Sequence, residues 1–123
     1  MAKFVKFEEI KAWQRARTVT RKIYQISSAE EFGRDFGLKD QIRRAAVSVM
    51  ANIAEGYGRR TSIEFANFVN IARGSAAEVQ SHLYIALDLG YVNQEQFDEL
   101  YGELTEISRM TLSLAQYLRN VPK

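Results

Sequence analysis

Residues 41–60 read QIRRAAVSVMANIAEGYGRR, and they carry the clearest structural signal in the sequence. Apolar residues recur in and just before this stretch at steps of three and four, which is the period of an amphipathic helix. They are Leu38, Ile42, Ala45, Ala46, Val49, Ile53 and Ala54. We therefore predict a helix that starts near Leu38 and stops at Gly56 or Gly58, in the left-handed conformation common at helix ends.

Upstream, the same period predicts a helix over about Glu8 to Ile26, followed by a loop over residues 27–37 that holds two glycines and mixed charges. Residues that share one face at 100° per residue form its apolar stripe. They are Ala12, Trp13, Ala16, Val19, Thr20, Ile23 and Tyr24.

Two further helices are predicted downstream. Thr61 and Glu64 match a capping box, in which each side chain accepts a hydrogen bond from the other residue's backbone. The helix that follows ends near residues 89–90, with a core face of Phe65, Phe68, Ala72, Ser75, Val79, Leu83 and Ala86. Asn93 and Gln96 open the last helix in a similar way, and Pro122 lies beyond its end. Its apolar stripe is Phe97, Leu100, Tyr101, Leu104, Ile107, Thr111, Leu114 and Leu118.

Long helices joined by short loops favour antiparallel neighbours, so we predict an all-α, up-down-up-down antiparallel four-helix bundle. A chain of 123 residues fits a single domain, residues 1–123. There is no apolar run long enough for a membrane span, and the acidic N-terminal region does not resemble a signal peptide. Together with the absence of cysteine, this favours a cytoplasmic protein.

The charges are unevenly distributed, although the net charge is only +2. Residues 1–60 hold 13 basic and 7 acidic side chains, whereas residues 61–123 hold 4 and 8. Such asymmetry is typical either of a nucleic-acid surface or of two halves that neutralise each other.

Enzyme chemistry finds little support in the sequence. Nucleophilic catalysis and zinc binding draw on cysteine and histidine, and the chain has no cysteine and one histidine, His82. We expect His82 to be a hydrogen-bonded structural residue. Glu78 precedes it by four positions, not the three of a di-iron bundle motif. Carboxylates at Glu55, Glu64 and Glu78 leave a weak acid/base alternative. We expect no enzyme activity, cofactor, metal or small-molecule substrate.

Seven basic residues are candidates for binding nucleic-acid phosphates, which needs cations but no base recognition. Arg43, Arg44, Arg59 and Arg60 are the first choice, and Lys11, Arg15 and Lys22 are the second. The alternative is that the basic stripe of the first helix pairs with acids of the last helix. Those acids are Glu95, Glu99 and Glu106, with Asp98 and Glu103 beside them.

Small and polar residues point to helix contacts before function. Gly74 and Ser75 begin a run of four small residues, which suits a close approach to the small residues Ala45, Ala46, Ala51 and Ala54. Asn52 and Glu55 fit capping or inter-helix hydrogen bonds, with a subunit or ligand contact as the alternative. Trp13 is expected in the core or an interface.

Three blocks of the sequence resemble a known family. The first is Phe7 with Trp13-Gln14-Arg15-Ala16, the second residues 41–58, and the third residues 71–78 with Leu83 and residues 87–91. These blocks resemble the four-helix-bundle proteins encoded in intervening sequences of bacterial 23S rRNA genes. The signature positions, which we assign to structure or to subunit contacts, are Asn52, Glu55, Gly56, Gly74, Ser75 and Glu78.

The resemblance implies a homopentamer, a ring of bundles. It also implies a relationship to the accessory protein of diversity-generating retroelements, a basic pentamer that partners a reverse transcriptase and nucleic acid. It supplies no catalytic residue. Our hypothesis is a homo-oligomeric, non-enzymatic protein that binds RNA through phosphate contacts. The alternative is an assembly or adaptor protein that binds another protein and no nucleic acid.

Overall fold

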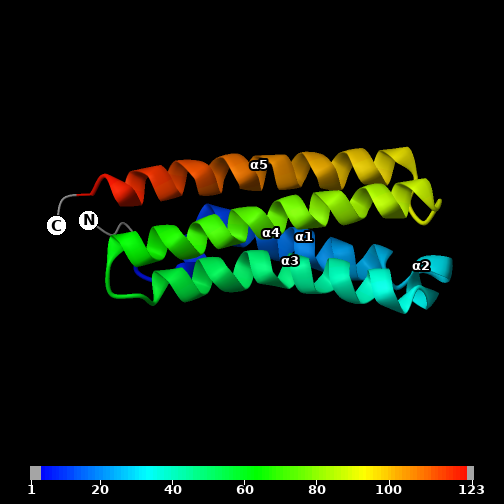
Figure 1. Ribbon diagram of the computed structural model, residues 1–123, viewed down its shortest axis with the longest axis horizontal. Coiled ribbons are helices and arrows are strands. Elements are labelled where there is room, and N and C mark those ends of the chain that lie inside the picture. Colours follow the sequence, from blue (N-terminus) through cyan, green and yellow to red (C-terminus); the bar gives the residue numbers. More distant parts are fainter. Residues whose placement is uncertain (1–3, 122–123) are drawn as a thin grey trace.

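A computed structural model describes residues 4–121. A short 3₁₀ turn, η1 (Phe7–Glu9), precedes five helices. They are α1 (Lys11–Ile26), α2 (Glu30–Arg34), α3 (Phe36–Tyr57), α4 (Ser62–Asp88) and α5 (Gln94–Arg119). Figure 1 shows the four long helices side by side, each running opposite to the one before it. The predicted all-α, up-down-up-down bundle is confirmed.

Each long helix packs against two others, so the bundle has four corners. α3 and α5 both contact α1, and both contact α4. The core runs along the length of the bundle and takes apolar side chains from every long helix. Val19, Ile42, Val69 and Leu104 are each at most 2% exposed. The prediction that Tyr24 belongs to the apolar stripe of α1 is wrong, because this residue is 41% exposed and lies at the surface beneath Arg43.

The helix starts predicted from side-chain caps are confirmed. Thr61 and Glu64 form a complete capping box at α4, and Asn93 and Gln96 form another at α5. The first helix begins later than predicted, because Glu8 belongs to the 3₁₀ turn and the extended backbone of Ile10 separates that turn from α1.

Residues 27–37 are more ordered than the predicted loop. Phe32 of α2 is 1% exposed and stacks on the Tyr91 ring, with 5.2 Å between ring centroids. The Tyr91 hydroxyl donates a 2.8 Å hydrogen bond to Asp35, whose carboxylate also accepts from the backbone N–H of Leu38. Asp35 is therefore the N-cap of α3, and α2 closes this end of the core.

The predicted left-handed stop at Gly56 or Gly58 is wrong. Gly56 is buried inside α3, and Gly58 has a right-handed φ of −78°. A Cβ on Gly56 would lie 2.7 Å from the Cβ of Phe68, so this glycine serves the close crossing of α3 and α4. Among the described glycines, Gly90 alone has a positive φ, 75°, and it follows the end of α4.

Candidate nucleic-acid interface

α1 is the most basic element of the bundle. It carries five basic side chains and no acidic one: Lys11, Arg15, Arg17, Arg21 and Lys22. Its core residues face α3 and α5, which leaves these charges on the outer face or at its margins. This face is where the neutralisation alternative and the phosphate hypothesis make different predictions.

Lys22 pairs with acids of α5, as the neutralisation alternative predicts. Its Nζ lies 2.8 Å from a carboxylate oxygen of Glu99 and 2.7 Å from one of Glu103, both on α5. The hydrogen bonds to Glu103 and Glu99 raise the pKa of Lys22, and the bond from Lys22 lowers the pKa of Glu99. Lys22 is thus a bridge between α1 and α5, and it is not free to bind a phosphate.

Lys11 and Arg15 do not pair with acids of α5. Both side chains are exposed, and neither forms an ion pair with any carboxylate in residues 4–121. Glu95 and Glu106, two of the acids proposed as partners for this stripe, make no bond to α1; Glu106 pairs with Arg109 on its own helix. The cations of the first half of α1 therefore remain available.

Arg43, a first-choice candidate, is engaged inside the chain. Its Nε donates to Ser27 Oγ at 2.8 Å, and its Nη2 donates to Ser28 Oγ at 2.8 Å and to the Tyr24 carbonyl at 3.2 Å. Its guanidinium also lies 4.3 Å from the centre of the Tyr24 ring. A cation is favourable at the C-terminus of a helix, and here Arg43 donates to one carbonyl of the last turn of α1, that of Tyr24. Arg43 therefore joins α3 to the end of α1.

The other first-choice arginines have looser contacts. Arg44 pairs with Asp40 one turn away, and the two side chains are 79% and 63% exposed. Arg59 pairs with Glu55 and lies over the Phe68 ring. Arg60 is exposed and has no ion pair within the described residues. Ion pairs this exposed are worth only about 0–1 kcal/mol, so a phosphate can displace them.

These arginines do not converge on one place. Arg43 contacts Ser27 and Ser28 in the α1–α2 connection, whereas Arg59 and Arg60 belong to the α3–α4 connection. Figure 1 shows these two connections at opposite ends of the bundle. From Arg43 to the end of α3 at Tyr57, 14 helical residues correspond to roughly 21 Å of axis. A ligand that touches both Arg43 and Arg59 must therefore follow most of the length of the bundle.

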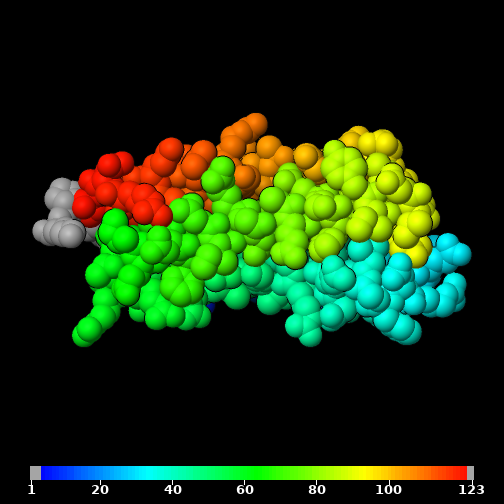
Figure 2. Space-filling view, viewed as in Figure 1, coloured from blue at the N-terminus to red at the C-terminus, as the bar shows by residue number. Residues whose placement is uncertain are grey.

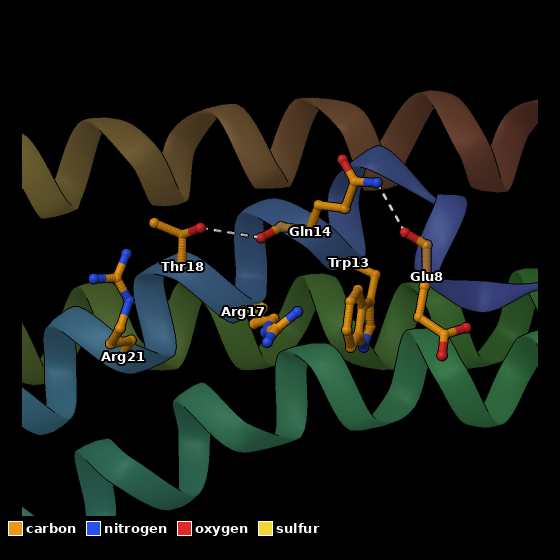
Figure 3. A pocket seen from close by; sticks show the side chains of 6 residues that line it. All are labelled: Glu8, Trp13, Gln14, Arg17, Thr18 and Arg21. Atoms are coloured by element: carbon orange, nitrogen blue, oxygen red, sulfur yellow. Dashed lines mark hydrogen bonds between the residues drawn. The ribbon is translucent and has the colours of Figure 1, made fainter.

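Two cations that the sequence reasoning did not select form the clearest basic site. Arg17 and Arg21 line a groove of about 550 Å³ on α1, which we call the α1 groove (Figure 3). Its other lining residues are Glu8, Trp13, Gln14 and Thr18. Trp13 is 9% exposed and packs against Phe7, which confirms its predicted core position. The helical period alone would have found the two arginines, since residues four apart share a face.

The predicted contact between the small and polar residues of α3 and α4 is confirmed in part: Ala45, Ala46 and Ser75 are buried, whereas Ala51 is exposed and Asn52 bonds within α3. Ser48 and Ser75 share a 2.8 Å hydrogen bond between the helices, and Asn52 donates to the Ser48 carbonyl and hydroxyl. Gly74 is exposed, and a Cβ there would meet nothing within 4 Å. The predicted close approach at Gly74 is wrong within the chain, because this residue faces outward while Ser75 faces α3.

His82 also differs from its prediction. Both ring nitrogens are buried without a hydrogen-bond partner, and Nε2 lies 3.9 Å from the Glu78 carboxylate. The weak carboxylate alternative gains no cluster, since Glu55 pairs with Arg59 and Glu64 caps α4. Within residues 4–121, no group of three or more His, Cys, Asp or Glu side chains is placed to hold a metal ion.

The fold and the site define a class: a bundle of antiparallel helices with an outward basic face on its first helix. None of the helices in residues 4–121 is long and apolar enough to cross a membrane. Residues 8–113 match the profile of the family described as 23S rRNA-intervening sequence protein. The chain belongs to this family, and the resemblance stated from its sequence blocks is confirmed.

A solved structure supports the same assignment. The crystal structure of a protein of unknown function from the S23 ribosomal protein family of Bacteroides thetaiotaomicron VPI-5482 superimposes with a TM-score of 0.78 at 25% sequence identity. The alignment covers 85% of this chain and 98% of that one. No curated protein matches the sequence.

Proposed function

We propose that this protein is a cytosolic, non-enzymatic RNA-binding protein that contacts backbone phosphates and acts as a homo-oligomer. One observation carries the proposal: α1 has five basic and no acidic side chains, and α5 neutralises only Lys22. A family named for an intervening sequence of 23S rRNA supports RNA as the nucleic acid.

The chemistry of this face suits phosphates better than bases. Guanidinium groups present a planar fork of donors that matches a phosphate, and contacts of this kind hold the RNA backbone without reading its sequence. The two aromatic residues of α1 are poorly placed to stack on bases, since Trp13 is 9% exposed and the Tyr24 ring lies beneath Arg43. Binding should therefore be weakly sequence-dependent and strongly salt-dependent.

The outer face of α4 supports self-association. Ile63, Ile71, Ile85 and Leu89 are 42–53% exposed, and Gly74 lies on the same side of the helix. Figure 2 shows α4 open to solvent along this view of the bundle. A surface helix normally shows polar residues outward, so four large apolar side chains exposed on a face that also carries Asn67, Glu78 and Ser81 fit contact with a second copy of the chain. A homopentameric ring, as the resemblance implies, would repeat weak RNA sites and increase their combined affinity.

The adaptor alternative rests on a specific observation too. Lys22 and Arg43 hold the bundle together, so part of the basic character of residues 1–60 is structural. In that alternative, the ring binds another protein and no nucleic acid.

A salt series separates the two. Anisotropy of a labelled single-stranded RNA is titrated with protein whose oligomeric state is fixed by light scattering. Each phosphate contact contributes about 0.7 to the slope of log affinity against log salt, so the double substitution K11Q/R15Q should lower that slope by about 1.4.

The matched control is R109Q, which removes a cation 72% exposed on α5 and should leave the slope unchanged. Absence of RNA binding at low salt by a well-formed oligomer would contradict the proposal and favour the adaptor.

A further inference from the structure

We infer that the α1 groove is the principal phosphate subsite of the RNA surface, with Arg17 and Arg21 binding successive phosphates of one strand. This inference rests on the proposed RNA binding and adds the residues and the place. Neither arginine belongs to the seven basic residues selected from the sequence.

The two arginines are placed to act together. They are four residues apart on α1, which puts their Cβ atoms about 5–6 Å from each other on one face. Neither forms an ion pair or a hydrogen bond within residues 4–121, in contrast to Lys22 and Arg43. Their donors are therefore unused.

Trp13 orients the first of them. The Arg17 guanidinium lies over the indole at 5.8 Å from the ring centre, at the outer limit of a cation–π contact. A guanidinium on an aromatic face keeps its N–H groups in its own plane, where they can reach a phosphate. The indole itself is too buried to stack on a base, so it holds the arginine and not the ligand.

The remaining groups form the walls of the groove. Gln14 Nε2 donates to the Glu8 carbonyl at 2.8 Å, and Thr18 Oγ1 donates to the Gln14 carbonyl at 3.3 Å (Figure 3). Both side chains are held by these bonds, and the guanidinium groups of Arg17 and Arg21 are the cationic donors that the groove presents. A volume of about 550 Å³ is sufficient for a short stretch of sugar–phosphate backbone.

Glu8 sets an acidic limit at one end of the groove. Glu8 is a lining residue of the groove, and its carboxylate forms no ion pair within the described residues, so its charge repels a phosphate nearby. Removing the charge of Glu8 should have the opposite effect to removing the arginines. We expect E8Q to strengthen RNA binding at low salt and R17Q/R21Q to weaken it.

The groove contains its own reporter, since Trp13 is the one tryptophan of the chain. A short single-stranded oligoribonucleotide is titrated into the full chain, with anisotropy of the labelled RNA and tryptophan emission recorded together. We expect both signals to change with one midpoint. R17Q/R21Q should abolish the emission change and lower the salt slope by about 1.4. K11Q/R15Q, which removes the same charge from the same helix, should weaken binding yet keep the emission change.

Each other outcome overturns a defined statement. RNA binding without an emission change, unaffected by R17Q/R21Q, would overturn the groove and leave the proposed function intact. No binding to wild-type protein would overturn both. Equal occupancy of the groove by polyglutamate of the same length would overturn the phosphate assignment in favour of an acidic protein segment. Circular dichroism of each variant checks that the bundle remains folded.

Discussion

Replacing Gly56 by alanine tests how closely α3 and α4 cross. A Cβ at this position would lie 2.7 Å from Phe68 Cβ, 2.9 Å from Phe65 Cδ1 and 3.1 Å from the Phe65 carbonyl oxygen. The Phe65 ring can move away, but Phe68 Cβ and the carbonyl oxygen are fixed to the backbone of α4. The two helices must therefore separate locally to accept the methyl group.

The magnitude follows from two opposing terms. Overpacking a core costs about 1–3 kcal/mol, and the backbone contacts place Gly56→Ala toward the upper part of that range. Alanine recovers about 1 kcal/mol of helix propensity relative to glycine. We expect a net loss of about 1–2 kcal/mol, which lowers the Tm by roughly 3–10 °C for a domain of this size.

The matched control is Gly102→Ala on α5. Gly102 is exposed within a helix, and a Cβ there would meet nothing within 4 Å, so this change should stabilise the protein by up to about 1 kcal/mol. Thermal and urea unfolding are compared at one protein concentration, because self-association makes Tm depend on concentration. If Gly56→Ala unfolds at or above the wild-type temperature, the close crossing inferred at this residue is wrong.

Other residues give sharp expectations as well. Asp35→Ala should cost about 1–2 kcal/mol, because it removes the N-cap of α3 and the acceptor of the Tyr91 hydroxyl; urea unfolding measures this. Leu104→Ala, at a position 0% exposed, should cost about 2–5 kcal/mol by the same assay. K22Q should lower the Tm between pH 4.5 and 10.5, and the difference in Tm between K22Q and wild type should disappear below and above this range. It disappears as pH falls through the lowered pKa of Glu99 or rises through the raised pKa of Lys22, and a pH-independent difference would contradict the ion-pair assignment.

The fold was largely predictable because its signals are local. Periodicity and the caps at Thr61 and Asn93 each depend on residues within one helix turn, and the structure confirms them. α2 was missed because its burial depends on Phe32 meeting Tyr91, 59 positions away in a different connection. Gly56 was misassigned for a related reason. A glycine near a helix end suits either a left-handed stop or a close crossing, and the deciding neighbour, Phe68, lies on another helix.

The basic site, too, was predictable only as far as it depends on residues close together in the sequence. The helical period of the sequence places Lys22 on the outer face of α1. Whether Lys22 or Lys11 meets the carboxylates of α5 depends on how α5 lies along the bundle, and in the structure they meet Lys22. Likewise, Arg43 looked as available as Arg44 until the end of α1 supplied three acceptors for it. The number of cations along a helix therefore identifies a basic face. Which of these cations are unpaired depends on the hydrogen bonds and ion pairs that the carboxylates and carbonyls of the neighbouring helices make. By that criterion Arg17 and Arg21 rank above Arg43, and α1 rather than α3 carries the candidate RNA surface.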